Sequence, residues 1–182
     1  GKREEMLRPG PQTSKDWCRY ARDAYREAEN CFQVEHWWAA VLLYGQSVEG
    51  SCKAVASLRL HEITTHDVGE LLEKTKGMVP PWVKPLIDEL ISKAQGWNRR
   101  ARQTTTYSYE PSHADTATFP GGSISVGDEY QTPRETFREP EATRARQVAC
   151  EVAESAAKIL DALGYKDEAE LLRSFSGGSP CR

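Results

Sequence analysis

Apolar positions near the start of the chain recur every three or four residues, as they do along one face of an α-helix. The first such stretch is "TSKDWCRYARDAYREAENCF", residues 13–32. Thr13 and Ser14 stand before it as candidate N-caps. The stretch predicts an amphipathic first helix with a buried face formed by Trp17, Ala21, Ala24, Ala28, Cys31 and Phe32.

A second helix is predicted by "WWAAVLLYGQSVEGSCKAVASLRL", residues 37–60, after the short link "QVEH". This stretch is apolar on more than one face, which predicts a position at the centre of a helical bundle. Small residues crowd its middle, residues 44–58. They allow another helix to approach closely, either from the same bundle or from a second copy of the chain.

Two further helices follow. The third is predicted in "HDVGELLEKTKG", residues 66–77, with Thr64 as its cap, Asp67 completing a variant capping box and Gly77 as its stop. The fourth is predicted in "PPWVKPLIDELISKAQGWNRRA", residues 80–101, whose prolines suit a first helical turn.

The helical pattern disappears over residues 103–140, which are rich in Thr, Ser, Gly and Pro, and no strand is predicted there or elsewhere. A loop of this length is usually functional or partly disordered. The pattern returns in residues 141–167, which predict the last main helix with Gly164 as its stop. A short final helix is predicted in "DEAELLRSF", residues 167–175.

The fold class predicted by these elements is all-α. Short links favour antiparallel neighbours, so we expect an antiparallel, up-and-down bundle of four to five main helices with a long loop before the last one. Residues 1–12 are expected to be a flexible linker, residues 13–175 a single helical domain, and residues 176–182 a flexible tail.

Charge and hydropathy exclude some classes of partner. Charged residues make up 28% of the chain and the net charge is −3, so the overall balance favours neither a nucleic-acid nor a membrane surface. No apolar run approaches the ~18 residues of a membrane span, and the N-terminal residues lack the apolar core of a signal peptide. We therefore expect a soluble, cytoplasmic protein.

The cysteines are not spaced like metal ligands. No CxxC pair is present, so neither a zinc site nor a disulfide framework is predicted, and no cofactor is expected. Four cysteines fall within helical patterns, where we expect small buried apolar residues, and the one in the tail is expected to be exposed. They are Cys18, Cys31, Cys52, Cys150 and, in the tail, Cys181.

The second helix also carries Gln46, Glu49 and Lys53. Glu49 and Lys53 are four residues apart in the order that favours a surface ion pair, which contributes only about 0.2–0.5 kcal/mol. A solvated face is one interpretation. The apolar surroundings favour the other, an interface.

Three stretches together resemble the HEPN family, the higher eukaryotes and prokaryotes nucleotide-binding domain. They are "QSVEGSCKAV" at residues 46–55, "TTHDVGELLEK" at 64–74 and "ATRARQVACEVAESAAKIL" at 142–160. The resemblance covers roughly Thr13 to Leu163. It implies a bundle of four or five helices and frequent homodimerisation. It also implies one of two activities, metal-independent RNA cleavage or nucleotide binding and assembly.

Family ribonucleases use an arginine and a histidine, because the RNA 2′-hydroxyl needs a proton acceptor and the phosphate a cation. Arg59 and His66 satisfy the spacing. However, Leu60 follows the arginine where the family has a polar residue, and a turn intervenes, so we expect His66 to open the third helix instead. A second version of the nuclease hypothesis pairs His113 with a fourth-helix arginine across a dimer.

Members of the binding type often carry Arg-Tyr-Pro after the fourth helix, whereas this chain has "YSYEPS" at residues 107–112. The missing positive charge could come from upstream, since guanidinium groups suit phosphate. The alternative is that these basic residues complement the helix dipole. The candidate nucleotide-binding residues are Lys53, Arg99, Arg100 and Arg102.

A glycine-rich segment, a His/Asp pair and the tryptophans could each suggest a binding site, but most of them have a simpler structural interpretation. The glycines of "FPGGSISVGD", residues 119–128, lack the Gly-Lys-Ser/Thr ending and preceding strand of a phosphate loop, so a flexible connection is predicted. His113 and Asp115 are too few to make a metal site. Trp37, Trp38 and Trp82 are interpreted as core or interface anchors, whereas Trp97 beside the arginines leaves RNA binding open.

The leading hypothesis is a non-catalytic HEPN-like module that binds nucleotides, forms homodimers and belongs to a larger multidomain protein such as a sacsin-like chaperone. No catalytic residue is assigned under it. The alternative is a metal-independent endoribonuclease, toxin or antiviral in type, that uses Arg59 and His66 and has RNA as its substrate.

Overall fold

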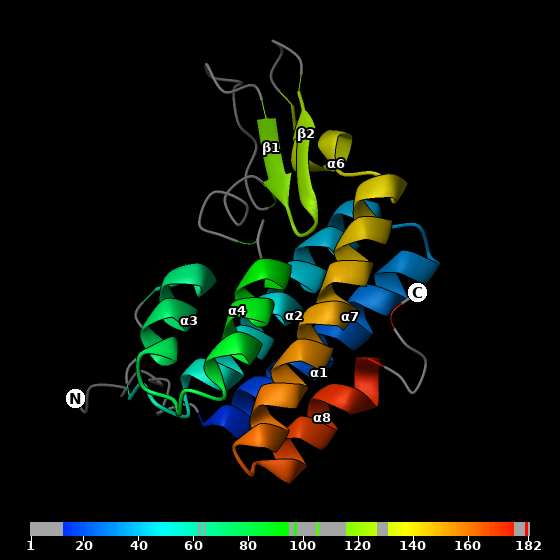
Figure 1. Cartoon of the computed structure of the whole chain (residues 1–182). Helices are drawn as coiled ribbons and strands as arrows, with labels where there is room; N and C mark the ends of the chain where they lie inside the picture. The colour runs from blue at the N-terminus through cyan, green and yellow to red at the C-terminus, as the bar shows by residue number, and fades with distance from the viewer. Residues whose placement is uncertain are drawn as a thin grey trace, which may run out of the picture.

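The structure is a computed structural model that describes residues 13–61, 63, 65–94, 97, 105, 116–126, 131–176 and 181. Helices α1 (Ser14–Gln33) and α2 (Trp37–Ala56) form a hairpin joined by three residues (Figure 1). Thr13 caps α1 as predicted, in a capping box with Asp16. The all-α class predicted from the sequence is confirmed.

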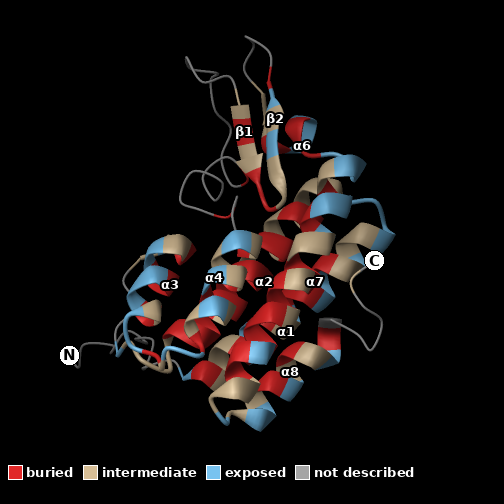
Figure 2. Cartoon of the chain, viewed as in Figure 1, coloured by how far each residue is buried: buried red, intermediate tan, exposed pale blue. Residues whose placement is uncertain are grey.

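Helix α2 occupies the centre of the bundle, as its apolar pattern predicts. Every residue from Val48 to Ala56 is buried, including Glu49 and Lys53 (Figure 2). A Cβ atom on Gly50 would lie 2.8 Å from Cδ1 of Tyr20 and 3.1 Å from Cβ of Ala21. The small residues of α2 therefore allow α1 of the same chain to approach closely.

Three more helices cover α2 and α1. The long helix α7 (Glu139–Ala162) packs on α2, and α8 (Lys166–Ser176) packs on α7 and α1. Helix α4 (Lys84–Ala94) also packs on α7. Gly164 follows α7 with a φ of +91°, a conformation that glycine adopts readily, and ends the helix as predicted.

Helix α3 (Val68–Lys76) begins two residues later than predicted. Its N-cap is Asp67, whose side chain accepts a hydrogen bond from the amide of Glu70. The predictions that Thr64 caps this helix and that His66 opens it were therefore wrong, because Asp67 has extended backbone and already satisfies the first turn. Thr64 itself lies outside the described residues.

Helix α4 also begins later than predicted. Pro80 and Pro81 form the turn before it, where the carbonyl of Pro80 accepts a hydrogen bond from the amide of Val83. Pro85 is the proline that stands in the first helical turn. Gly77 ends α3 as predicted.

The loop predicted at residues 103–140 contains secondary structure. Strands β1 (Thr116–Phe119) and β2 (Gly122–Ser125) form an antiparallel hairpin beyond the bundle, followed by α6 (Pro133–Thr136) (Figure 1). Pro120 and Gly121 make the two-residue turn, and Gly121 has a φ of +107°. The expectation of no strand was wrong, because four-residue strands leave little periodicity to detect.

The hairpin is anchored by aromatic packing. The ring of Phe119 lies 5.9 Å from that of Phe137, edge to face, and both side chains are fully buried. A Cβ on Gly121 would lie 3.2 Å from Cβ of Arg144. The hairpin turn therefore lies directly on the first half of α7.

The cysteine prediction was wrong in two respects. Cys150 on α7 forms a disulfide with Cys181, which was expected to be free and exposed. The partners lie 31 residues apart in the sequence, and only the return of the chain past α8 brings them together. The other three cysteines are free. Cys18 and Cys52 are buried as predicted, whereas Cys31, also predicted to be buried, is only half-buried.

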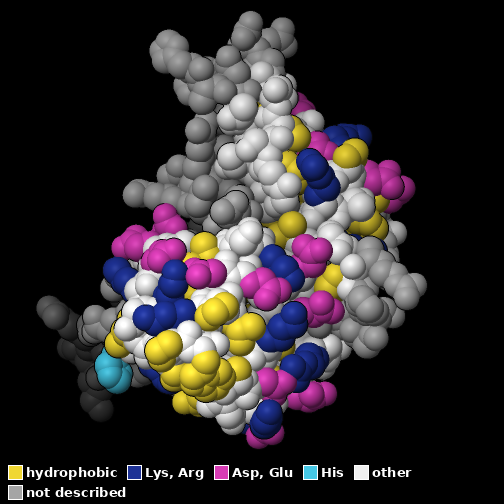
Figure 3. All heavy atoms as spheres, viewed as in Figure 1, with side chains coloured by type: hydrophobic (Ala, Val, Ile, Leu, Met, Phe, Trp, Pro, Cys, Tyr) yellow, Lys and Arg dark blue, Asp and Glu magenta, His cyan; other side chains and the backbone are white. Residues whose placement is uncertain are grey.

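The fourth-helix region also exposes a tryptophan. Trp82 in the link between α3 and α4 is 62% exposed, so it belongs to no core. Figure 3 shows hydrophobic side chains gathered near this link, where Met78 is exposed as well. Within the described part of the chain, no helix combines the length and apolar character needed to cross a membrane.

Candidate functional sites

Two residues named from the sequence meet in a polar cluster between α2 and the start of α3. Lys53 Nζ lies 3.3 Å from Glu49 Oε1, and His66 Nδ1 lies 2.8 Å from the same oxygen. Glu49 is 4% exposed and Lys53 5%. The ion pair is therefore buried, which corrects the alternative of a solvated face.

Burying two charges costs several kcal/mol per ion unless each is closely paired. Besides Glu49, Lys53 Nζ has a cation–π contact, 4.7 Å from the centre of the Trp17 ring. The 3.4 Å approach to His66 Nδ1 brings two donors together and compensates nothing, because that nitrogen carries the hydrogen that faces Glu49. Its charge is thus compensated inside the cluster. A lysine held in this way is poorly placed to neutralise a phosphate.

His66 is the accessible member of the cluster, with 48% of its side chain exposed. The 2.8 Å contact to a carboxylate oxygen assigns a hydrogen to Nδ1, because a carboxylate can only accept. In the neutral ring, Nε2 is then the proton acceptor. Glu49 and His66 therefore form a carboxylate–imidazole pair.

Arg59, the proposed partner of His66, is occupied elsewhere. Its Nε donates to the carbonyl of Met78 at 3.2 Å, and its Nη1 to the carbonyl of Leu58 at 3.1 Å. The bond to Met78 ties the segment that follows α2 to the α3–α4 link. The other sequence candidates, Arg99, Arg100, Arg102 and His113, lie outside the described residues.

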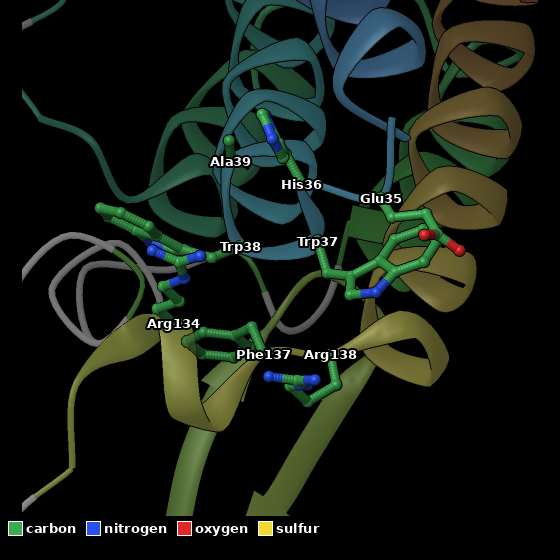
Figure 4. A pocket seen from close by; sticks show the side chains of 8 residues that line it. All are labelled: Glu35, His36, Trp37, Trp38, Ala39, Arg134, Phe137 and Arg138. Atoms are coloured by element: carbon green, nitrogen blue, oxygen red, sulfur yellow. The ribbon is translucent and has the colours of Figure 1, made fainter. Parts of the chain in front are cut away.

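A pocket of about 470 Å³ lies at the opposite end of α2 (Figure 4). One wall comes from the α1–α2 link and the first turn of α2. The other comes from α6 and the start of α7. The lining residues are Glu35, His36, Trp37, Trp38, Ala39, Arg134, Phe137 and Arg138.

The α1–α2 link, which forms part of one wall of the pocket, contains an unusual backbone conformation. Glu35 has a φ of +63°, which non-glycine residues rarely adopt. His36 is the N-cap of α2, yet its side chain makes no capping hydrogen bond among the described residues. The first turn of α2 therefore borders the pocket without a capping bond from His36, at the positive end of the helix dipole.

Two indoles are fixed beside these amides. Trp38 Nε1 donates to the carbonyl of Thr105 at 2.6 Å, and the Trp37 ring packs edge to face on Phe32 at 5.1 Å. Both tryptophans are half-buried, so part of each ring faces the pocket.

The opposite wall supplies positive charge. Arg134 and Arg138 approach the pocket from opposite sides of Phe137 (Figure 4). Both are exposed, and neither forms an ion pair within the described part of the chain. Their charges are available to an anion.

The family model of the HEPN domain matches residues 14–163. The chain belongs to the HEPN domain family. This confirms the resemblance seen in the sequence. No curated protein and no solved structure matches the chain.

In this HEPN domain, the pocket residues were missed by sequence reasoning. Trp37 and Trp38 were interpreted as anchors, and Arg134 and Arg138 stood in a segment read as loop. One signal was present. Thr132 and Glu135 form a capping box around Pro133, which marks the start of the short helix that carries Arg134.

Proposed function

We propose that this HEPN domain is a non-catalytic module that binds a nucleotide in the pocket at the start of α2. The observation that carries the proposal is that Arg134, Arg138 and the first turn of α2, which its N-cap side chain leaves uncapped, line one cavity together with two indoles. Guanidinium groups and helix N-termini bind phosphate oxygens. Indole faces stack on bases.

The dimensions and chemistry of the pocket agree with this ligand class. Its volume of about 470 Å³ is within the range of about 300–1,000 Å³ that small-molecule sites occupy. Trp38 is held by its hydrogen bond to Thr105, so its ring loses little freedom on binding. Glu35 is the carboxylate among the lining residues, and His36 adds an imidazole.

Lys53 is not assigned to the phosphate, since Glu49 compensates its charge inside the bundle. Arg99, Arg100 and Arg102 stay candidates for additional phosphate contacts.

The test is a calorimetric titration of wild type with nucleoside monophosphates and triphosphates. Replacing both Arg134 and Arg138 by Ala should weaken binding at least 10-fold, because a hydrogen bond to a charged group contributes about 1.5–3 kcal/mol. The matched control removes the same charge from α1, with Arg19→Ala and Arg26→Ala, and should bind as wild type does. No heat with wild type, or equal loss in both double variants, would end the proposal.

Self-association is part of the same proposal, as is a place in a larger multidomain protein of the sacsin-like kind. Exposed Trp82 and Met78 support association, because tryptophan is enriched at the centres of interfaces. Light scattering measures the mass directly. A dimer that Trp82→Ser converts to monomer is expected, and a monomer at all concentrations would contradict it.

Metal-independent RNA cleavage is the second candidate, favoured by the Glu49–His66 hydrogen bond that leaves Nε2 as a proton acceptor. Its weakness is the placement of Arg59 on backbone carbonyls. The test is incubation of structured RNA with the protein in EDTA. Cleavage that His66→Ala abolishes and His61→Ala preserves would support it, whereas intact RNA would exclude it.

A further inference from the structure

We propose that Cys150, Glu154 and Cys181 bind a thiophilic divalent cation, Zn²⁺ above all, when their disulfide is reduced. Ligand atoms from these three residues all lie within 4.8 Å of one another. In the structure the two sulfurs are bonded to each other. The inference does not depend on the nucleotide pocket.

The three ligands are positioned by two separate devices. Cys150 and Glu154 are four residues apart on α7, so their side chains lie on one face of the helix. Cys181 is held by more than its sulfur: its carbonyl accepts a hydrogen bond of 2.7 Å from Gln147 Nε2. Because Gln147 is also on α7, this bond can retain Cys181 near the helix after the disulfide opens.

The electrostatics of this helix face favour a cation. The Glu154 carboxylate lies beside the two sulfurs, and Glu151 on the same helix accepts a hydrogen bond of 3.1 Å from Gln147 Nε2, so negative charge gathers on this part of α7. Two free thiolates beside them would repel one another and the carboxylates. A divalent cation compensates this charge. The reduced site is therefore more stable with a bound metal ion than as two free thiolates.

The donor set identifies the class of cation. Two soft thiolates with one carboxylate oxygen suit Zn²⁺, and the thiolates disfavour the hard cations Mg²⁺ and Ca²⁺. Three protein ligands leave the fourth tetrahedral position to water, with Zn–S distances of about 2.3 Å and Zn–O distances of about 2.0–2.2 Å. Cys150 is buried whereas Glu154 and Cys181 are half-exposed, so a cation can enter from solvent.

Opening the Cys150–Cys181 disulfide requires a reductant, and a dithiol of the kind that keeps thiols reduced in the cytosol supplies it. The reductant transfers two electrons and two protons to the disulfide and is itself oxidised to a disulfide. Binding of Zn²⁺ then displaces the two thiol protons. A disulfide oxidant reverses the sequence: it takes two electrons from the thiolates and two protons from water to become a dithiol, while the Cys150–Cys181 bond forms again and the ion is released.

Native mass spectrometry of the full chain tests the site, with a phosphine as reductant because phosphines add no competing thiol. The reduced wild type should bind one Zn²⁺ and the oxidised wild type none. Titration with Co²⁺ should give the visible absorption of tetrahedral thiolate coordination.

Cys181→Ser should lower Zn²⁺ affinity at least 100-fold, and Glu154→Gln at least 10-fold. Glu139→Gln removes the same charge from the first turn of α7, away from the three ligands, and should change affinity less than threefold. No zinc in the reduced wild type would overturn the proposal. So would uptake unchanged by Cys181→Ser, since the ion would then sit on other cysteines.

Discussion

Gly45 lies directly against the indole of Trp97. A Cβ atom at position 45 would be 2.4 Å from two carbons of that ring, Cζ3 and Cη2. Trp97 is 1% exposed and is the largest fully buried side chain among the described residues. The absence of a side chain at one position of α2 thus makes room for a tryptophan that follows α4.

Gly45→Ala should therefore destabilise the fold by about 1–3 kcal/mol, the usual cost of overpacking a dense core. Urea denaturation measures this as a lower midpoint with an unchanged slope. Gly77→Ala is the matched control: its new Cβ would meet its nearest atom at 3.5 Å, an ordinary contact. Equal losses of stability in Gly45→Ala and Gly77→Ala would show that the contact of position 45 with Trp97 is not the cause of the loss.

The buried ion pair gives a second prediction. Glu49→Gln should cost about 3–5 kcal/mol of stability, because it leaves the Lys53 charge buried without its partner. Replacing Lys53 by Met in the same chain should recover much of the loss. His66→Ala should cost less than Glu49→Gln, since half of the imidazole is exposed. If the stability losses of Glu49→Gln and Lys53→Met simply add in the double variant, the two residues are not coupled and the prediction is contradicted.

Thiol reactivity gives a third prediction. Burial raises the pKa of Cys18 to about 12 and raises that of Cys52 as well, so almost no thiolate forms at neutral pH. Cys31 is half-buried and its pKa is raised for the same reason. Alkylation by iodoacetamide should modify Cys31 first at every pH, at rates that increase with pH. Faster modification of Cys18 in the folded chain would refute this order.

Acid stability gives a fourth. The hydrogen bond from Arg173, together with the charges of Arg173 and Lys166, lowers the pKa of Asp161 in the folded chain. A carboxyl with a lowered pKa stabilises the fold above its unfolded pKa of about 3.9 and loses that contribution as pH falls through the folded value. Asp161→Asn should thus cost up to about 1 kcal/mol at pH 7.

The same variant should cost less at pH 2 than at pH 7, because the contribution of the carboxylate is lost as pH falls through its lowered folded pKa. The free energy of unfolding of both proteins, measured from pH 2 to pH 7, checks this. If the difference in free energy of unfolding between the two proteins stays constant with pH, the effect of Asp161→Asn does not come from this ion pair.

The helices could be predicted because each has a local signature. One-sided burial imposes the spacing of Ala21, Ala24 and Ala28 on α1, and all-round burial imposes the apolar run of α2. Capping adds the Thr13 start and the Gly164 end. Boundaries were less accurate at α3, where Thr64 and Asp67 are both able to cap and only the backbone conformation selects Asp67.

The candidate site was predicted only in part. His66 and Lys53 were named from chemistry and spacing, but their meeting at Glu49 depends on how the α2–α3 link returns to α2. The pocket depends on segments about a hundred residues apart, so Trp38 and Arg134 carry no local sign of one another. A tryptophan in a helical pattern looks the same whether it fills a core or lines a cavity.

The sequence by itself determined the helical class, the central position of α2, the caps of α1 and α7 and the membership of the HEPN family, because these follow from periodicity and short motifs. Only the tertiary structure decided that Glu49 and Lys53 are buried, that Cys150 meets Cys181, and that Arg134 and Arg138 face the first turn of α2. The physical reason is that periodicity reports the solvation of a single segment. Contacts between distant segments depend on how the whole bundle closes.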